Sequence, residues 1–274
     1  MQNSAIVLIG GAGKTGSRIA DRLTRKGLDF RFASRSSAHP FDWEKRNDWP
    51  AALAGANSAY VSFQPDLSVS WAADAIDALA RTAIGCGLSH IVLLSGRGEE
   101  GAQRAEEALK ASGIGFTILR ASWFCQNFSE GAFAEQIAAG ELALPAGDVR
   151  EPFIDAADIA DAAVAALTDP RHMGKTYELT GPRALTFREA VAEISAACGR
   201  DIAYGQISMA EFKETLGDAD LPEGVIELLG ELFTQVLDGR NSLVTNGVAD
   251  ILGRPARDFG AYARDVAING TWRI

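Results

Sequence analysis

Residues 4–16 read SAIVLIGGAGKTG, a short apolar run that ends in glycines spaced GxxGxxG and leads into a helix-forming segment. In this setting Gly10 permits the tight turn from strand to helix, and Gly13 lets the backbone approach a pyrophosphate. Gly16 then lets the helix pack closely on the sheet, while free N–H groups at the helix start attract phosphates. A glycine pattern also occurs in ordinary turns, but its place between a strand and a helix predicts a nucleotide site.

Lys14 and Thr15 complete this loop as candidate contacts to the cofactor phosphates. A lysine on the first turn of a helix is equally compatible with a purely solvated position. The sequence leaves that choice open.

The end of the second predicted strand indicates which dinucleotide the loop accepts. Enzymes that use NAD typically place an acidic residue there, about 20 residues past the loop, to accept the ribose 2′-hydroxyl. This chain has Arg35 instead, 19 residues after Gly16 and directly after Ser34. A guanidinium holds a 2′-phosphate through charge-assisted hydrogen bonds, and Ser34 adds a hydroxyl donor. A solvent-facing arginine is the alternative, but the position predicts NADP(H) rather than NAD(H).

Outward from the loop, short apolar runs alternate with helix-forming segments. The predicted strands cover 4–9, 29–34, 59–63, 90–95 and 115–119, and the predicted helices include 14–26, 68–85 and 99–112. This alternation predicts βαβ units with right-handed crossovers, and therefore a doubly wound, Rossmann-type parallel sheet of the α/β class. Ligands of such sheets bind at the carboxyl ends of the strands.

The regular alternation weakens after about residue 128, which suggests a second, smaller part of the molecule. We expect a dinucleotide-binding core over 1–180 and a mostly helical substrate cap over 181–274, with 129–148 contributing to the cap. Within the cap, Thr186 and Glu189 have the spacing of a capping box at the start of a helix.

Composition and charge narrow the classes of partner. The 274 residues carry 26 basic and 36 acidic side chains, a net charge of −10 that disfavours nucleic acids and anionic membranes. No run approaches the roughly 18 to 20 apolar residues of a membrane span, and the first residues do not resemble a signal peptide. The three cysteines and three histidines are scattered. We therefore expect a cytoplasmic protein with reduced thiols and no metal site.

Several motifs beyond the glycine loop point to one family. They are FDW at 41–43, IVLLS at 91–95, ASGIGFTILR at 111–120, ASWFCQNF at 121–128, PFIDAADIA at 152–160 and YELTGP at 177–182. With them the chain resembles the NmrA-like group of atypical short-chain dehydrogenase/reductases over nearly its whole length. GKTGSR with FDW is most similar to the fungal agroclavine dehydrogenase-like (ergot alkaloid) branch and its bacterial relatives.

The resemblance assigns roles to individual residues. It implies a phosphate loop around Gly10, Gly13 and Gly16, a 2′-phosphate contact at Arg35, adenine contacts at Asp42 and Trp43, and a nicotinamide-ribose wall at Phe63 and Gln64. It also implies a site serine at Ser95 and a substrate border at Trp123, Phe124 and Asn127. Core packing is the alternative for Trp43, Trp123 and Phe124, and Ser95 is equally compatible with a simple strand end.

The usual catalytic pair of short-chain dehydrogenases is absent. That pair is a tyrosine with a lysine four residues later, but the four tyrosines of this chain are followed at that spacing by Gln64, Gly181, Ser208 and Val266. Related benzylic ether reductases use a lysine where this chain has Ala102. No general acid is predicted, Ser95 is the candidate for polarising the acceptor, and Arg97 is expected to be solvated.

The resemblance implies an NADPH-dependent oxidoreductase that transfers hydride to a small, electron-poor organic acceptor such as an iminium ion, a quinone or an enone. Such acceptors need little proton transfer, so binding and orientation can suffice. The alternative is a protein without catalytic activity that binds NAD(P) and reports redox state to a protein partner, as the NmrA regulator does. We expect a monomer or a homodimer.

Overall fold

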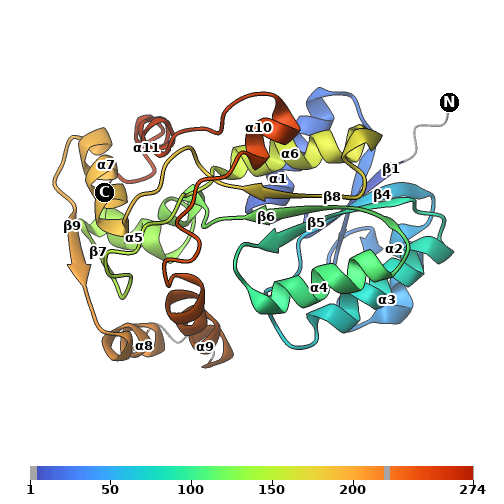
Figure 1. Ribbon diagram of the computed structural model, residues 1–274, viewed down its shortest axis with the longest axis horizontal. Coiled ribbons are helices and arrows are strands. Elements are labelled where there is room, and N and C mark those ends of the chain that lie inside the picture. Colours follow the sequence, from blue (N-terminus) through green and yellow to red (C-terminus); the bar gives the residue numbers. More distant parts are fainter. Residues whose placement is uncertain (1–4, 219–222, 274) are drawn as a thin grey trace. The chain divides into compact units, whose positions relative to one another are not determined.

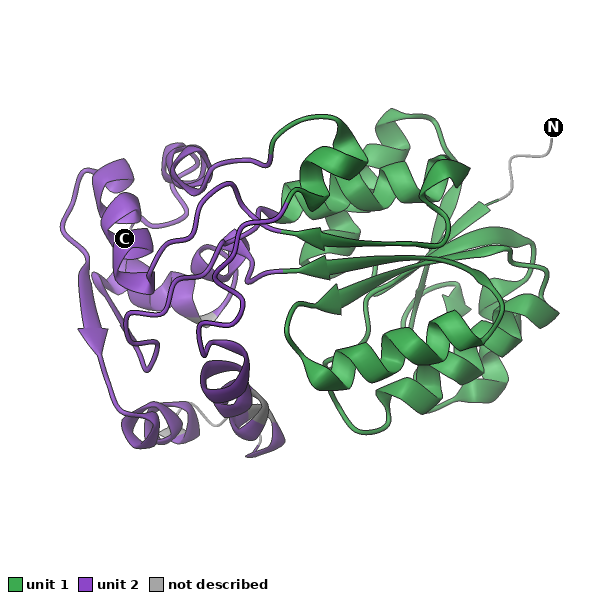
Figure 2. Ribbon diagram, in the orientation of Figure 1, with its two compact units in different colours: residues 1–121, 156–179, 246–255 green, residues 122–155, 180–245, 256–274 purple. Residues whose placement is uncertain are grey.

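The computed structural model describes residues 5–218 and 223–273, and the chain divides into two compact units (Figures 1 and 2). Unit 1 comprises residues 1–121, 156–179 and 246–255, and unit 2 comprises 122–155, 180–245 and 256–274. Ser4, the first residue of the predicted strand 4–9, lies outside the described residues.

Unit 1 contains a seven-stranded sheet in the order β3-β2-β1-β4-β5-β6-β8, and every described pairing is parallel. Its strands are β1 (Ala5–Ile9), β2 (Phe30–Ser34), β3 (His39–Pro40), β4 (Ala56–Val61), β5 (His90–Gly96), β6 (Gly115–Ala121) and β8 (Lys175–Leu179). Strands buried on both faces form near-continuous apolar runs, as AIVLI of β1 does. The predicted doubly wound sheet is confirmed.

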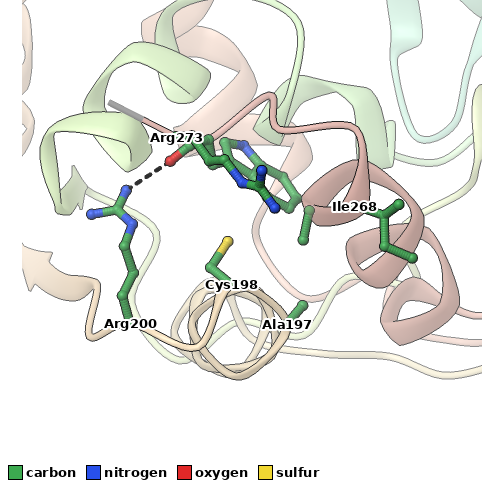
Figure 3. A pocket seen from close by; sticks show the side chains of 7 residues that line it. Ala197, Cys198, Arg200, Ile268 and Arg273 are labelled. Atoms are coloured by element: carbon green, nitrogen blue, oxygen red, sulfur yellow. Dashed lines mark hydrogen bonds between the residues drawn. The ribbon is translucent and has the colours of Figure 1, made fainter.

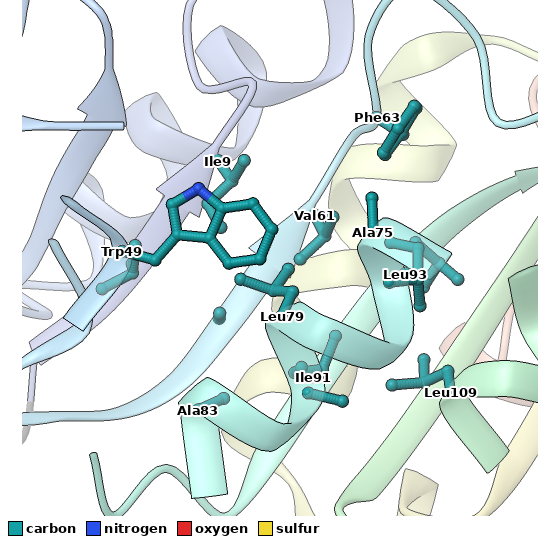
Figure 4. Packing of buried hydrophobic residues seen from close by; sticks show 14 of the residues in the cluster. Ile9, Trp49, Val61, Phe63, Ala75, Leu79, Ala83, Ile91, Leu93 and Leu109 are labelled. Atoms are coloured by element: carbon teal, nitrogen blue, oxygen red, sulfur yellow. The ribbon is translucent and has the colours of Figure 1, made fainter. Parts of the chain in front are cut away.

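Helices cover both faces of this sheet (Figure 1). They are α1 (Lys14–Arg25), α2 (Trp49–Leu53), α3 (Ala72–Gly85), α4 (Glu100–Ala111), α6 (Ala156–Thr168) and α10 (Gly247–Leu252). α1 packs against α6 on one face, and α3 packs against α4 on the other. On the α3 face, Leu79 and Ala83 meet Val61 and Ile91 of the sheet in the main core (Figure 4). The small alanines of α3 allow this close packing.

α10 belongs to unit 1, although the sequence places it within the predicted cap. A Cβ on Gly247 would collide with the backbone of Glu178, so the start of α10 lies directly against β8. Arg254 just beyond the helix forms an ion pair of 2.7 Å with the buried carboxylate of Asp158 on α6. These contacts join segments that are far apart in the sequence. A single boundary at residue 180, as between the predicted core and cap, does not reproduce this arrangement.

Unit 2 is mostly helical. Its elements are α5 (Ala132–Ala139), α7 (Phe187–Cys198), α8 (Met209–Asp218), α9 (Glu223–Glu231), α11 (Phe259–Ile268) and the parallel pair β7 (Glu141–Leu144) with β9 (Ala203–Gln206). The predicted capping box is confirmed, because the Thr186 hydroxyl accepts from the N–H of Glu189 and the Glu189 carboxylate accepts from the N–H of Thr186. Aromatic rings fill the core around Phe128, which contacts Phe153 and Phe187.

Candidate functional site

The phosphate loop between β1 and α1 has the close backbone packing that its glycines predict. Gly10 adopts a φ of +79°, and a Cβ there would lie 2.7 Å from the carbonyl oxygen of Ser62. A Cβ on Gly16 would lie 2.5 Å from the Cα of Gly11. The N–H of Gly13 donates a 3.1 Å hydrogen bond to the carbonyl of Gly10 and closes the turn. Since no side chain fits, both positions 10 and 16 require glycine.

The first turn of α1 is open to an anion. Its N-cap residue is Gly13, no side chain in the described part of the chain caps it, and its first turn contains no acidic residue. Lys14 is half-buried at the helix start. Thr15 turns inward instead: it is 3% exposed, and its hydroxyl lies 2.7 Å from that of Tyr60. Any contact from Thr15 to a phosphate therefore has to come from its backbone N–H.

Arg35 follows the strand next to the phosphate loop. β1 and β2 pair in parallel with Ile9 opposite Ala33, so the loop and the turn after β2 leave the same edge of the sheet. The hydroxyl of Ser37 accepts a 3.0 Å hydrogen bond from the N–H of Ser34 and fixes that turn. The Arg35 side chain is exposed and forms no hydrogen bond or ion pair with the residues that the structure describes. A guanidinium placed in this way is available to a ligand phosphate.

Five aromatic side chains form a row after β3 and β4, which we call the aromatic row: Phe41, Trp43, Trp49, Phe63 and Trp71. The ring centroids of Trp43 and Phe63 are 4.3 Å apart, and those of Phe63 and Trp71 are 4.8 Å apart. Phe63 is buried, Trp43 is half-buried and Trp71 is 39% exposed. The row thus packs on the core and also presents aromatic surface. Trp71 was not predicted, since its neighbours in the row come from other segments.

Asp42 shapes the turn after β3. Its carboxylate accepts a 3.1 Å hydrogen bond from the N–H of Glu44, and its carbonyl accepts a 2.7 Å bond from the indole N–H of Trp49. Gln64 is exposed directly after Phe63. The cofactor contacts expected of Asp42, Trp43 and Gln64 stay predictions.

Ser95 belongs to a buried polar network at the carboxyl end of β5. It is 3% exposed, and its hydroxyl donates to Glu106, which has no exposed surface. Arg120 of β6 clamps both carboxylate oxygens of Glu106 and reaches Glu178 of β8 at 3.4 Å. Because the Ser95 hydrogen is committed to this carboxylate, the placement argues against Ser95 as the group that polarises an acceptor.

Arg97 belongs to the same network, and its expected solvated position is wrong. The side chain is 9% exposed, and its Nε lies 3.1 Å from the carboxylate of Glu178. Neither Glu106 nor Glu178 was singled out in the sequence. The sequence did contain a sign that Glu106 is buried, since this residue shares the apolar face of α4 with Ala102 and Leu109. A charged residue on such a stripe needs a buried partner.

In unit 2, the predicted substrate residues lie in a segment that packs against the aromatic core. Trp123, Phe124 and Asn127 are all half-buried. The Trp123 ring packs against Phe187 and Phe233 with centroids 5.5 Å and 5.1 Å apart. Trp123 therefore contributes to the aromatic core of unit 2 and keeps part of its surface exposed. The role of these three residues toward a substrate stays a prediction.

Unit 2 also contains a pocket of about 480 Å³ between α7 and the C-terminal segment (Figure 3). Its lining includes Cys198, Arg200 and Arg273, and the guanidinium of Arg200 donates to the carbonyl of Trp272 at 3.2 Å. Burial raises the pKa of the Cys198 thiol. None of the predicted site residues lines this pocket.

Two negative findings hold for the described residues. No group of three or more histidine, cysteine, aspartate or glutamate side chains there is arranged to hold a metal ion. Within the same residues, no helix combines the length and apolarity required to cross a membrane.

Known proteins resemble this chain at both the sequence and the fold level. The model of the NmrA-like family matches residues 103–242. The NAD(P)H azoreductase of Xenophilus azovorans is 31% identical over 287 residues, which cover 94% of this chain and 96% of that protein. Agroclavine dehydrogenase of Claviceps fusiformis is 30% identical over 279 residues, which cover 95% of this chain and 96% of that protein.

One solved structure that superposes well is the NADPH complex of an NADPH-dependent quinone oxidoreductase from Escherichia coli. It aligns with a TM-score of 0.81 and 22% identity, over 95% of this chain and 99% of that one. At this identity the likeness shows a shared fold alone.

Proposed function

This chain belongs to the NmrA-like family, and on that premise we propose that it is an NADPH-dependent reductase of small, electron-poor organic acceptors. Iminium ions, quinones and enones are the acceptor classes that we include. The observation that carries the proposal is the pairing of an open phosphate loop after β1 with an exposed, unengaged Arg35 after the neighbouring strand β2.

These residues fit the parts of NADPH. The backbone N–H groups of Thr15 and Gly16 in the first turn of α1 would hold the pyrophosphate, which the positive end of the helix attracts. Arg35 would hold the 2′-phosphate, because its guanidinium presents several N–H donors, whereas a carboxylate at this position would repel the phosphate. The half-buried ring of Trp43 offers a flat apolar surface near that turn, of the kind on which an adenine stacks.

The family relatives support a reductase. One is an azoreductase that uses NAD(P)H and another is agroclavine dehydrogenase, so oxidoreductase activity recurs among proteins 30–31% identical to this chain. NADPH, when bound, supplies hydride, and an electron-poor carbon accepts it without prior activation. The protein then has to hold the acceptor against the cofactor and keep water out. Trp123, Phe124 and Asn127 are the residues that we propose for the acceptor.

The test is the loss of NADPH absorbance with a panel of quinones, enones and iminium compounds, with NADPH affinity measured in parallel. Turnover that depends on Arg35 would establish the reductase and its acceptor class. Tight binding of NADPH without turnover on any acceptor would contradict the proposal. It would favour a protein that senses the cofactor for a partner.

A further inference from the structure

A carboxyl group that the sequence did not single out lies at the carboxyl end of β5. Glu99 stands three residues after Gly96, the last residue of that strand, and directly before α4. A Cβ added to Gly96 would overlap all three atoms of the Glu99 carboxyl group. The carboxyl group therefore rests against the Cα of Gly96, in space that exists because residue 96 is glycine.

The loops after β4 and β5 meet around this carboxyl group. A Cβ on Gly101 would overlap the carbonyl oxygen of Ser68, so the start of α4 packs on the backbone after β4. Asp66 of the same loop accepts hydrogen bonds from the N–H and the hydroxyl of Ser68, at 2.7 Å and 2.6 Å. Glu99 is half-buried, and no described residue forms a hydrogen bond or an ion pair with its side chain.

This environment favours the protonated acid. Burial, and in second place the negative charge of Asp66, raise the pKa of Glu99 to about 8. The cation nearest in the sequence, Arg97, has its Nε on Glu178 at 3.1 Å, and the adjacent Glu100 is exposed. Below about pH 8 the Glu99 carboxyl group is thus mostly protonated, and its hydrogen has no acceptor among the described residues. The residue as a whole is half-buried.

Glu99 also lies at the edge of the sheet where ligands of this fold bind. In a doubly wound sheet the ligand lies across the carboxyl ends of the strands, on both sides of the point where the strand order reverses. Here that point lies between β1 and β4. Arg35 follows β2 on one side of it, whereas Glu99 follows β5 on the other. A dinucleotide held at Arg35 by its adenosine half would extend its nicotinamide half over β4 and β5.

We propose that Glu99 is the proton donor of this reductase. The inference rests on the proposed function. Hydride from NADPH brings two electrons to a carbon of the acceptor, the π electrons move to the acceptor oxygen, and that oxygen takes the hydrogen from a carboxyl oxygen of Glu99. Glu99 is left as a carboxylate and regains a proton from water, so each turnover consumes one NADPH and one proton.

A proton donor is required for some of the proposed acceptor classes and not for others. A quinone or an enone gains a negative charge when hydride adds, so it requires the proton. An iminium ion becomes a neutral amine and requires none. Glu99 is therefore needed for the former acceptors and dispensable for the latter.

The first measurement is an infrared titration of the protein without cofactor. The carbonyl band of a protonated carboxylic acid should be present at neutral pH, vanish as the pH rises through about 8, and be missing in Glu99→Gln. In Gly96→Ala the new methyl group displaces the flexible Glu99 side chain toward solvent, and the band should be missing at neutral pH there as well. Glu100→Gln, which changes the exposed neighbouring carboxyl group, should retain the band.

The second measurement compares acceptors. Glu99→Gln should lower the rate of quinone or enone reduction by roughly a hundredfold, a typical general-acid contribution, while iminium reduction and NADPH affinity change less than about threefold. The wild-type rate with a quinone should fall about tenfold per pH unit above the pKa of Glu99, and the iminium rate should not. Glu100→Gln should leave both rates unchanged.

The outcomes are distinguishable. A wild-type protein without the acid band, or with a band that survives Glu99→Gln, overturns the proton-donor role. Equal losses for both acceptor classes also overturn it, since they indicate a structural role, and the proposed reductase function then stands. A wild-type protein that binds NADPH and reduces neither class overturns the proposed function and the proton donor with it.

Discussion

The hydroxyl of Ser95 donates a 2.7 Å hydrogen bond to Glu106, a carboxylate without exposed surface. Arg120 holds the same carboxylate with a contact of 2.6 Å and also reaches Glu178. The contacts join the carboxyl ends of β5, β6 and β8 to the middle of α4. A buried charge of this kind is tolerated because each of its oxygens has a partner. Ser95 thus stabilises the carboxyl ends of the strands, where the candidate site lies.

Replacing Ser95 with alanine should lower the free energy of unfolding by about 1–3 kcal/mol, because one hydrogen bond to a buried carboxylate is lost. We expect the loss in urea unfolding and only a small change in turnover. Ser70→Ala, at an exposed position, serves as the control. A hundredfold loss of turnover with unchanged stability would return Ser95 to a catalytic role.

Replacing Arg35 with alanine should weaken NADPH binding by roughly ten- to a hundredfold, the value of a charge-assisted contact, and leave NADH binding nearly unchanged. Fluorescence titration with both cofactors measures the difference. Arg81→Ala, at an exposed arginine on α3, removes the same charge elsewhere and should alter neither affinity. Equal losses for NADPH and NADH would show that Arg35 does not select the 2′-phosphate.

Replacing Gly16 with alanine should abolish nucleotide binding and destabilise unit 1, because the added Cβ would lie 2.5 Å from the Cα of Gly11. Gly85→Ala is the matched control. Gly85 ends α3, has no atom within 4 Å of an added Cβ, and should be neutral or stabilising by about 0.5–1 kcal/mol. Calorimetry with and without NADPH measures both effects. Wild-type affinity in Gly16→Ala would refute the packing assigned to this loop.

Acid should destabilise the fold through His90. Its Nε2 lies 2.9 Å from the hydroxyl of Thr117, which itself donates to the carbonyl of His172, so Nε2 is the donor of this hydrogen bond. Burial, and then the charge of His172, lower the pKa of His90 from 6.5 to about 4. The unfolded chain therefore binds the extra proton first, and stability falls as the pH drops from 6.5 toward 4.

The contribution of this histidine is on the order of 2–3 kcal/mol across that window. Urea unfolding at several pH values should show a shallower pH dependence in His90→Gln than in the wild type. His39→Gln, at an exposed histidine, should follow the wild type. Parallel curves for all three proteins would contradict a neutral, buried His90.

Replacing Trp123 with alanine should alter turnover or acceptor binding while NADPH affinity stays within a few-fold, if the exposed part of its ring borders the acceptor. The ring also packs on Phe187 and Phe233, so a loss of a few kcal/mol in stability is expected too. Trp123→Phe retains much of that packing and separates the two effects. If kinetics follow stability alone in both variants, Trp123 is a core residue only.

The sequence by itself determined the features that depend on neighbouring residues. The GxxGxxG spacing after an apolar run predicted the phosphate loop, because Gly10 and Gly16 leave no space for a side chain. Thr186 and Glu189, three residues apart, predicted the capping box. The same reasoning from neighbouring residues placed Arg35 directly after β2.

Only the tertiary structure decided which distant residues meet. Ser95 and Glu106 are paired because α4 covers the end of β5, and α10 joins unit 1 because Gly247 fits against β8. The Glu99 carboxyl group depends on Gly96 for its space and on the approach of Asp66 for part of its raised pKa. Burial and the electrostatic field at a group are sums over contacts between remote segments, so periodicity and spacing along the chain do not contain them.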